Sequence, residues 1–376
     1  MIKHYLCAAM KAYEKLIEKA LTEGYLNLDE GLSLYLDAPL PELMAAAHIL
    51  RQKAVAGNRV GWIIDRNVNI TNVCFSQCKF CNFCRKANDA EAYITSHEEY
   101  TIKIRELFER GGNQLLLQGG MNPGLGLEYY EDLFSELKTR FPALKLHALG
   151  PPEVVYLAQK SSLSYRDVLI RLVNSGLDSL PGAGAEILAD RVRKIVSPAK
   201  ATTEQWLNVM REAHRLNLPT SATMMFGHVE TPGERIEHLI RLREVQEEKP
   251  EGSYGFVTFV PWPFQDEGTV LALKHNIRSR VTIIDYVRLV AVSRIMLTNI
   301  TNIQSSILTV GKDAAMMTLH GGANDLGSVM IEENVVSAAG SNGMLNAEQL
   351  QMVIRDAGFV PQQRNQKYEA VNKLET

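Results

Sequence analysis

Short runs of apolar and β-branched residues alternate with longer amphipathic stretches from about residue 66 onward. Such alternation is typical of repeated βα units and a parallel sheet. We predict eight strands, at residues 68–73, 114–117, 144–149, 179–180, 221–226, 256–260, 302–305 and 315–319. The helices predicted between them span residues 98–109, 129–140, 164–174, 203–216, 232–247 and 283–298. The simplest closure of eight parallel strands is a (βα)8 barrel of the TIM type, in the α/β class.

Helical periodicity dominates both ends of the chain. Before residue 66, apolar residues such as Leu6, Met10 and Tyr13 recur at three- and four-residue spacing, which predicts an N-terminal helical extension over residues 1–65. We then expect the barrel over residues 66–340. In the C-terminal segment, 341–376, residues 348–358 predict one more helix, and the polar tail after it is expected to fray.

The composition favours a globular protein with a small-molecule ligand. Of 376 residues 46% are hydrophobic, and 43 acidic residues against 40 basic ones give a formal net charge of −3. Nucleic-acid binding would demand an excess of Lys and Arg, so we expect no such partner. Charges such as Lys11 and Glu14 interrupt the N-terminal pattern where a secretory signal would be apolar. No run reaches the ~18 apolar residues of a membrane span, so we expect a cytoplasmic protein without membrane contact.

Four of the five cysteines fall within eleven residues, directly after the first predicted strand. The motif is Cys74-Phe-Ser-Gln-Cys78-Lys-Phe-Cys81, followed by Cys84. Three thiolates at this spacing can wrap one face of a [4Fe-4S] cluster and leave one iron without a cysteine. A structural zinc site is the first alternative, although zinc ligand pairs usually lie a dozen or more residues apart and the nearest later histidine is His97. The second is an electron-transfer cluster with Cys84 as its fourth ligand.

Two later strand ends carry residues suited to a cofactor. The second strand is followed by Gln118, Gly119 and Gly120. Paired glycines there let the backbone approach a ligand closely, although Gly-Gly turns also occur commonly as simple connections between elements. Glu186 stands among small and apolar residues after the fourth strand. Its carboxylate could accept ribose hydroxyls, or it could serve only as a favourable charge at a helix N-terminus.

Three further strand ends carry residues suited to a substrate. His228 and Glu230 follow the fifth strand, and a hydrogen-bonded interior role for the histidine stays open. Trp262 lies in the aromatic sequence after the sixth strand, which could cover a flat apolar ligand and exclude water, or pack in the core. Asn324 and Asp325 lie in a polar, glycine-rich stretch after the eighth predicted strand.

The cysteine motif, with Phe80 just before its third cysteine, resembles that of the radical S-adenosylmethionine (radical SAM) superfamily. The resemblance implies that Cys74, Cys78 and Cys81 bind a [4Fe-4S] cluster and that the amino and carboxylate groups of S-adenosyl-L-methionine chelate its open iron. One-electron reduction, by a partner such as flavodoxin or ferredoxin, would then release a 5′-deoxyadenosyl radical. It also implies contacts to the cofactor, from the following residues: Phe80, Gln118, Gly119, Gly120 and Glu186.

Longer stretches resemble one branch of this superfamily, which makes futalosine-derived intermediates of menaquinone and the deazaflavin chromophore. They are TNVCFSQCKFCNFC, LQGGMNPGLGLEYY, HALGPPEVVYLA, GLDSLPGAGAEIL, TSATMMFGHVET and GGANDLGS. The continuation Asn82-Phe83-Cys84-Arg85 and the VPWPFQ sequence are most similar to the cyclases of that branch. They imply oxidative C–C cyclisation of dehypoxanthine futalosine to cyclic dehypoxanthinylfutalosinate, begun by hydrogen abstraction from ribose C4′.

The same resemblance implies a substrate site, and the residues we expect in it are His228, Glu230, Trp262, Asn324 and Asp325. No residue of the sequence identifies itself as the base that collects the ring proton, so no catalytic residue is assigned. Aminofutalosine synthase and the deazaflavin (F0) synthase subunit are the alternatives within the superfamily. A non-enzymatic iron–sulfur electron carrier is a third, although a carrier has no need of an eight-strand barrel.

Overall fold

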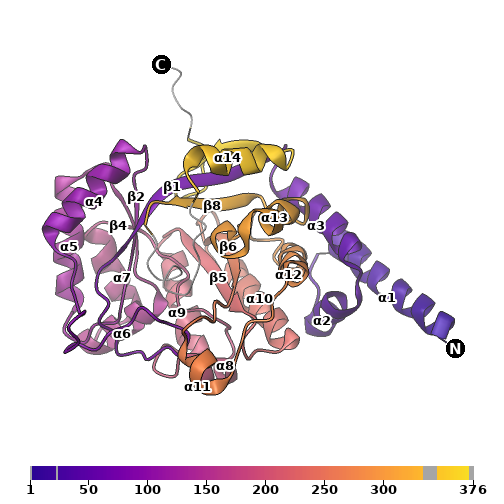
Figure 1. The fold of residues 1–376 in the computed structure, drawn as a ribbon, viewed down its shortest axis with the longest axis horizontal. Coiled ribbons are helices and arrows are strands. Elements are labelled where there is room, and N and C mark those ends of the chain that lie inside the picture. Colours follow the sequence, from indigo (N-terminus) through magenta and orange to yellow (C-terminus); the bar gives the residue numbers. More distant parts are fainter. Residues whose placement is uncertain (1, 23, 333–344, 372–376) are drawn as a thin grey trace, which may run out of the picture.

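The computed structural model describes residues 2–22, 24–332 and 345–371, with side chains from residue 12 onward except at residue 23 and in the gaps. Its centre is a barrel of parallel strands surrounded by helices (Figure 1). The barrel strands are β1 (Arg59–Asn69), β2 (Gln114–Gln118), β3 (Lys145–Ala148), β4 (Leu177–Ser179), β5 (Thr220–Phe226), β6 (Phe256–Pro263), β7 (Asn302–Ile303) and β8 (Asp325–Met330).

The strands form two parallel sheets that meet at both edges. One sheet has the order β4-β3-β2-β1-β8 and the other β5-β6-β7. Single parallel bridges, Leu180 to Thr220 and Gln304 to Asp325, join the sheets. The (βα)8 barrel expected from the sequence is therefore confirmed, and its eight strands close into a ring.

The helices follow the strands along the chain and cover the outside of the barrel (Figure 1). Many begin at a Ser, Thr or Asn whose side chain accepts a backbone N–H, such as Thr231 before α10. After β1 come α4 (His97–Glu109), α5 (Leu127–Arg140), α6 (Pro151–Ser161), α7 (Tyr165–Asn174), α8 (Asp190–Val196), α9 (Thr203–Arg215), α10 (Pro232–Glu247), α11 (Val270–His275), α12 (Ile283–Met296), α13 (Ile307–His320) and α14 (Ala347–Asp356). None of the helices in the described residues has the length and apolar composition needed to span a bilayer.

The N-terminal helices are α1 (Ile2–Thr22), α2 (Leu28–Asp37) and α3 (Leu40–Ala54), and the last two pack against α10 and α12. The first strand starts at Arg59, so the boundary expected at residue 65 falls inside β1, and the strand expected at residues 68–73 was placed too late. The reason is visible in β1, whose inward positions include the polar residues Asp65 and Asn67. These interrupt the hydrophobic alternation that marks a strand.

The eighth strand was also predicted in the wrong place. Residues 315–319 lie in α13, where their apolar side chains belong to the helix face that packs on the barrel. The strand itself is β8, whose sequence DLGSVM carries Asp, Gly and Ser instead of an apolar run. The predicted boundary at residue 340 lies outside the described residues.

The C-terminal tail is part of the barrel rather than a frayed end. After α14, β9 (Val360–Gln363) adds a parallel strand to β1, and Arg364 continues this pairing through a backbone hydrogen bond to Trp62. Arg364 is 6% exposed and forms an ion pair with the fully buried carboxylate of Asp325. The described part of the tail, which reaches residue 371, therefore crosses one end of the barrel and closes it.

Candidate active site

The cysteine loop begins five residues after β1 and is held by backbone hydrogen bonds to other barrel loops. Phe75 N–H donates to the carbonyl of Met121 after β2, and Lys79 N–H to the carbonyl of Val196 at the end of α8. The Ser76 hydroxyl lies 2.9 Å from Cys74 Sγ and 3.4 Å from Cys78 Sγ, and the Met121 N–H donates to Cys74 Sγ. The loop thus gathers thiols at the carboxyl ends of the strands, where barrel enzymes place their chemistry.

Cys84 lies near the motif as well. Burial raises the pKa of its thiol, and the neighbouring thiols of Cys81 and Cys74 add to that rise. In the described residues, no three His, Cys, Asp or Glu side chains converge as ligands of a single ion. A cubane cluster does not require such convergence, since each thiolate binds a different iron.

The paired glycines after β2 allow that strand to pack tightly against the approach to the cysteines. A Cβ on Gly120 would lie 2.1 Å from the carbonyl oxygen of Val73, and one on Gly119 would lie 2.9 Å from that of Thr71. The Gly120 N–H also donates to the Thr71 carbonyl at 2.7 Å. The close approach seen here is between two backbone segments, and neither glycine lines the cavity described next.

The interior of the barrel contains a cavity of about 410 Å³ between the cysteine loop and the C-terminal tail. Four of the residues expected to bind cofactor or substrate line it, namely Phe80, Gln118, Glu186 and Trp262. Trp262 lies in the extended strand β6 rather than in a surface loop. Apolar side chains such as Leu116, Met225 and Val260 line part of it, and polar groups line the rest.

One polar end, next to the cysteines, is built around Glu186 and Lys200. The Glu186 carboxylate is 5% exposed and accepts hydrogen bonds from Lys200 at 2.9 Å and Arg193 at 3.3 Å. Burial opposes its charge, but the two cations outweigh burial and hold its pKa below the ordinary value. Lys200 Nζ also lies 5.4 Å from the ring centre of Phe80. Sequence analysis missed Lys200, which sits in a loop without a motif.

Burial governs the other titratable groups at this end. It raises the pKa of the Cys78 thiol to about 12, a rise that Lys200 limits. Burial also raises the pKa of Glu153, at the start of α6, to about 7.

His228 and Glu230 do not reach the cavity wall. Glu230 accepts the backbone N–H groups of Gly227 and His228 and forms an ion pair with Arg235. His228 Nε2 lies 2.9 Å from the carbonyl of Met225, and both its side chain and that of Glu230 are fully buried. These residues fix the turn after β5, which is the interior role that the sequence had left open for the histidine.

Asn324 and Asp325 are likewise below the cavity rather than in it. Asn324 Oδ1 accepts from Arg294 at 2.7 Å and from the Ile303 N–H, and Asp325 pairs with Arg364. Both lie at the start of β8, at the end of the barrel opposite the cysteines. The expectation that they contact substrate rested on a strand placed ten residues too early in the chain.

The second polar end was not predicted, and it combines strand residues with the tail. It is lined by Asp65, Gln114, His147, Ser328, Gln304, Arg364, Gln366 and Tyr368. Polar side chains at every second position of β1 were a usable signal for its strand part. The tail part gave no signal, because pairing across 300 residues leaves no trace in local periodicity.

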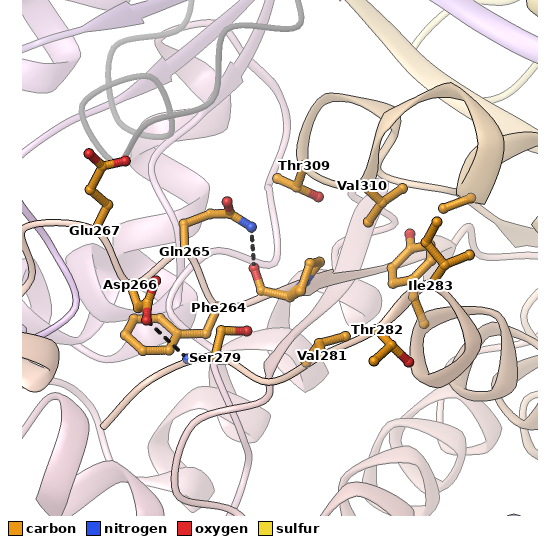
Figure 2. Close-up of a pocket in the computed structure, with 13 residues that line it drawn as sticks. Phe264, Gln265, Asp266, Glu267, Ser279, Val281, Thr282, Ile283, Thr309 and Val310 are labelled. Carbon is orange, nitrogen blue, oxygen red and sulfur yellow. Dashed lines mark hydrogen bonds between the residues drawn. The ribbon is translucent and has the colours of Figure 1, made fainter. Parts of the chain in front are cut away.

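A second cavity of about 350 Å³ lies on the other side of the segment after β6 (Figure 2). Pro263, Phe264 and Gln265 form a wall shared by the two cavities. Gln265 donates to the Pro263 carbonyl at 3.1 Å, and the Ser279 N–H donates to Asp266 at 3.2 Å (Figure 2).

Comparison with known proteins identifies the family. Residues 68–242 match the model of the "Radical SAM superfamily", and residues 253–376 match that of the "CofH/MqnC C-terminal region". A "Cyclic dehypoxanthine futalosine synthase" from Streptomyces coelicolor is 41% identical over 359 residues, covering 95% of this chain and 88% of the relative. The chain belongs to the radical SAM superfamily.

Other radical SAM relatives have a different activity. A "5-amino-6-(D-ribitylamino)uracil--L-tyrosine 4-hydroxyphenyl transferase 1" from Methanosarcina barkeri is 39% identical over 366 residues, covering 96% of this chain and 94% of the relative. Among solved structures, methylornithine synthase (PylB) has a TM-score of 0.66 at 18% identity, covering 93% of this chain and 98% of PylB. The maturase HydG has a TM-score of 0.70 at 15% identity, covering 96% of this chain and 78% of HydG. The structural matches show the shared barrel.

Radical SAM enzymes bind a [4Fe-4S] cluster and S-adenosylmethionine, and this enzyme uses both. The donor set of the cysteine loop fits the cluster, because thiolates are its ordinary ligands and the Met121 N–H already donates to one of them. The cavity end lined by Phe80, Glu186 and Lys200 fits a cofactor that carries both hydroxyl and carboxylate groups.

Proposed function

We propose that this radical SAM enzyme cyclises dehypoxanthine futalosine to cyclic dehypoxanthinylfutalosinate, on the futalosine route to menaquinone. The observation that carries the proposal is the 41% identity to a cyclic dehypoxanthine futalosine synthase over 95% of the chain. A second such synthase, from Halalkalibacterium halodurans, is 39% identical over 96% of the chain. We further propose that Cys74, Cys78 and Cys81 are the cluster ligands and that the enzyme is cytoplasmic.

The cluster and S-adenosylmethionine, when bound and reduced by a flavodoxin or ferredoxin, supply the radical that removes hydrogen from ribose C4′. The carbon radical would then add to the benzoate ring, and aromaticity would be restored by loss of one proton to solvent and return of one electron to the flavodoxin or ferredoxin, so that S-adenosylmethionine is the net oxidant. The product therefore has two hydrogen atoms fewer than the substrate. Addition within one molecule is fast only if ribose and arene are held close together.

The chain's own residues would meet these needs inside the barrel cavity. Glu186 and Lys200 lie at the cysteine end, where the cofactor must bind. Trp262, Met225 and Val260 give the cavity apolar surface, which suits an aromatic ring and keeps water away from a carbon radical. A cavity of about 410 Å³ is within the range typical of small-molecule sites.

The transferase activity of the methanogen relatives is the second candidate, because their identity of 39% is nearly as high. The two candidate substrates differ in their aromatic parts. They share a hydroxylated five-carbon unit, which is a ribose in one and a ribityl chain in the other.

Anaerobic turnover separates these candidates. Reconstituted enzyme is given S-adenosylmethionine, a reductant and either dehypoxanthine futalosine or 5-amino-6-ribitylaminouracil with tyrosine. We expect 5′-deoxyadenosine and a product lacking two hydrogens from the first substrate only. Turnover of the second mixture, with none of the first, would reject the proposal.

A further inference from the structure

The cavity end farthest from the cysteines contains a carboxylate in an unusual setting. Asp65 is 5% exposed and lines the cavity from β1, and Asn67, two residues on, lines it from the same strand face. One Asp65 oxygen accepts from Gln114 Nε2 at 3.1 Å, and the other from the Ser328 hydroxyl. Strands β1, β2 and β8 together hold this group in the cavity wall.

Two amide oxygens beside Asp65 are buried without a hydrogen-bond partner among the described residues: Gln114 Oε1 and Asn67 Oδ1. Both residues line the cavity. Gln114 must donate its NH₂ group to Asp65, so its carbonyl oxygen cannot be exchanged with that group by a flip of the amide. Buried acceptors without a donor are costly, so these two oxygens need a donor, which a ligand or a water molecule in the cavity can supply.

The charges around Asp65 decide which donors fit. Three ionisable groups lie close enough to interact electrostatically with Asp65: Asp325 on β8, and Arg364 and Tyr368 in the tail. Arg364 donates two hydrogen bonds to Asp325, at 2.5 and 2.9 Å, so its charge is already committed. An anionic group would meet the Asp65 carboxylate and two acceptor oxygens without a donor here, while the one cation that the described residues place in this part of the cavity wall, Arg364, is already paired with Asp325, which disfavours the benzoate end of the substrate. Neutral hydroxyl groups supply donors without that repulsion.

We propose that Asp65, Gln114 Oε1 and Asn67 Oδ1 form a subsite that accepts hydrogen bonds from the sugar hydroxyls of the substrate. The inference rests on the proposed function and extends it, because it fixes which end of the substrate lies deepest in the barrel. The hydroxyls on C1′, C2′ and C3′ of dehypoxanthine futalosine provide the donors. Ribose C4′ then faces the cofactor end of the cavity, and the aromatic ring lies against its apolar surface.

A cycle that combines protein variants with substrate analogues tests the subsite. Dissociation constants of dehypoxanthine futalosine and its 2′-deoxy and 3′-deoxy analogues are measured by calorimetry on anaerobic, cluster-loaded enzyme. Gln114→Met removes the acceptor at similar length, and Asp65→Asn removes the charge. We expect each variant to weaken binding of the parent substrate about 5- to 30-fold, as for a lost hydrogen bond of ~1–2 kcal/mol. The same variants should weaken binding of at least one deoxy analogue less than about twofold.

The controls keep the outcomes distinct. Thr139→Val alters a hydroxyl outside the cavity, which donates to the Ser135 carbonyl on the exposed face of α5, and should leave all the dissociation constants within about twofold. The iron content of each variant shows whether it is folded and carries the cluster. If one variant fails this check, Asn67→Leu is measured in its place. Equal weakening of the parent and both analogues, or parent-like binding by the variants, would overturn the subsite. Failure of the unaltered enzyme to bind or convert dehypoxanthine futalosine would instead reject the proposed function.

Discussion

Replacing Arg364 by Met tests whether the C-terminal tail seals the barrel. The guanidinium donates to both oxygens of Asp325, whose side chain is fully buried, while Arg364 itself is nearly so. Methionine fills much of the same space but supplies no charge and no donor. The substitution therefore leaves Asp325 as an uncompensated carboxylate that retains only the Gly327 N–H as a donor among the described contacts.

Breaking a buried ion pair from one side costs about 3–5 kcal/mol, because the remaining charge has no counter-ion. For a chain of this length, that loss lowers the melting temperature by about 4–6 °C. The assay is thermal unfolding of the cluster-loaded protein under anaerobic conditions. Asp325→Asn added to Arg364→Met should recover part of the loss, because the buried charge is then gone.

Arg355→Met is the matched control. Arg355 lies on the exposed face of α14 and bonds only to Gln351 within the described contacts, so its loss should change the melting temperature by less than about 1 °C. If Arg364→Met behaves like this control, the tail does not seal the barrel in the way the ion pair indicates.

Three more substitutions test other parts of the structure. Burial raises the pKa of Asp65 from 3.8 to about 6, so its ionised form opposes folding by up to about 3 kcal/mol at neutral pH. Asp65→Asn should raise the melting temperature there, with the gain vanishing as the pH falls through these two values; a gain independent of pH would contradict the argument. Gly120→Ala should lower the iron bound per chain, because its Cβ meets a backbone carbonyl, whereas a Cβ on Gly233 meets only the Thr231 hydroxyl at an ordinary contact distance of 3.9 Å, so Gly233→Ala should not. Cys84→Ala should keep both the iron and the response to S-adenosylmethionine, and loss of the cluster would make Cys84 a ligand.

The local hydrophobic pattern of the sequence was sufficient to predict most of the barrel strands. The strands β2, β5 and β6 are buried over most of their length and β3 alternates between buried and half-buried positions, and each was predicted within a few residues of its start. Strands β1 and β8 were misplaced for the same physical reason. Their inward faces carry Asp65, Asn67 and Ser328, which line a cavity rather than fill a core. Sequence reasoning thus failed where the barrel interior is a polar-lined cavity.

The candidate site divides in a similar way. Phe80, Gln118 and Glu186 could be found because each lies close to a motif or a strand end, and all three line the cavity. Lys200 and Tyr368 reach the same cavity through long-range packing, which single-sequence periodicity does not record. His228 and Asn324 were also chosen because they follow predicted strands, but their hydrogen-bonding groups are turned toward backbone and buried neighbours.

Electron paramagnetic resonance of the reduced, cluster-loaded enzyme, before and after addition of S-adenosylmethionine, tests the central claim most directly. We predict a changed spectrum on addition, with hyperfine coupling from the cofactor's amino nitrogen when it carries ¹⁵N. An unchanged spectrum, with every iron already ligated by protein side chains, would contradict the account.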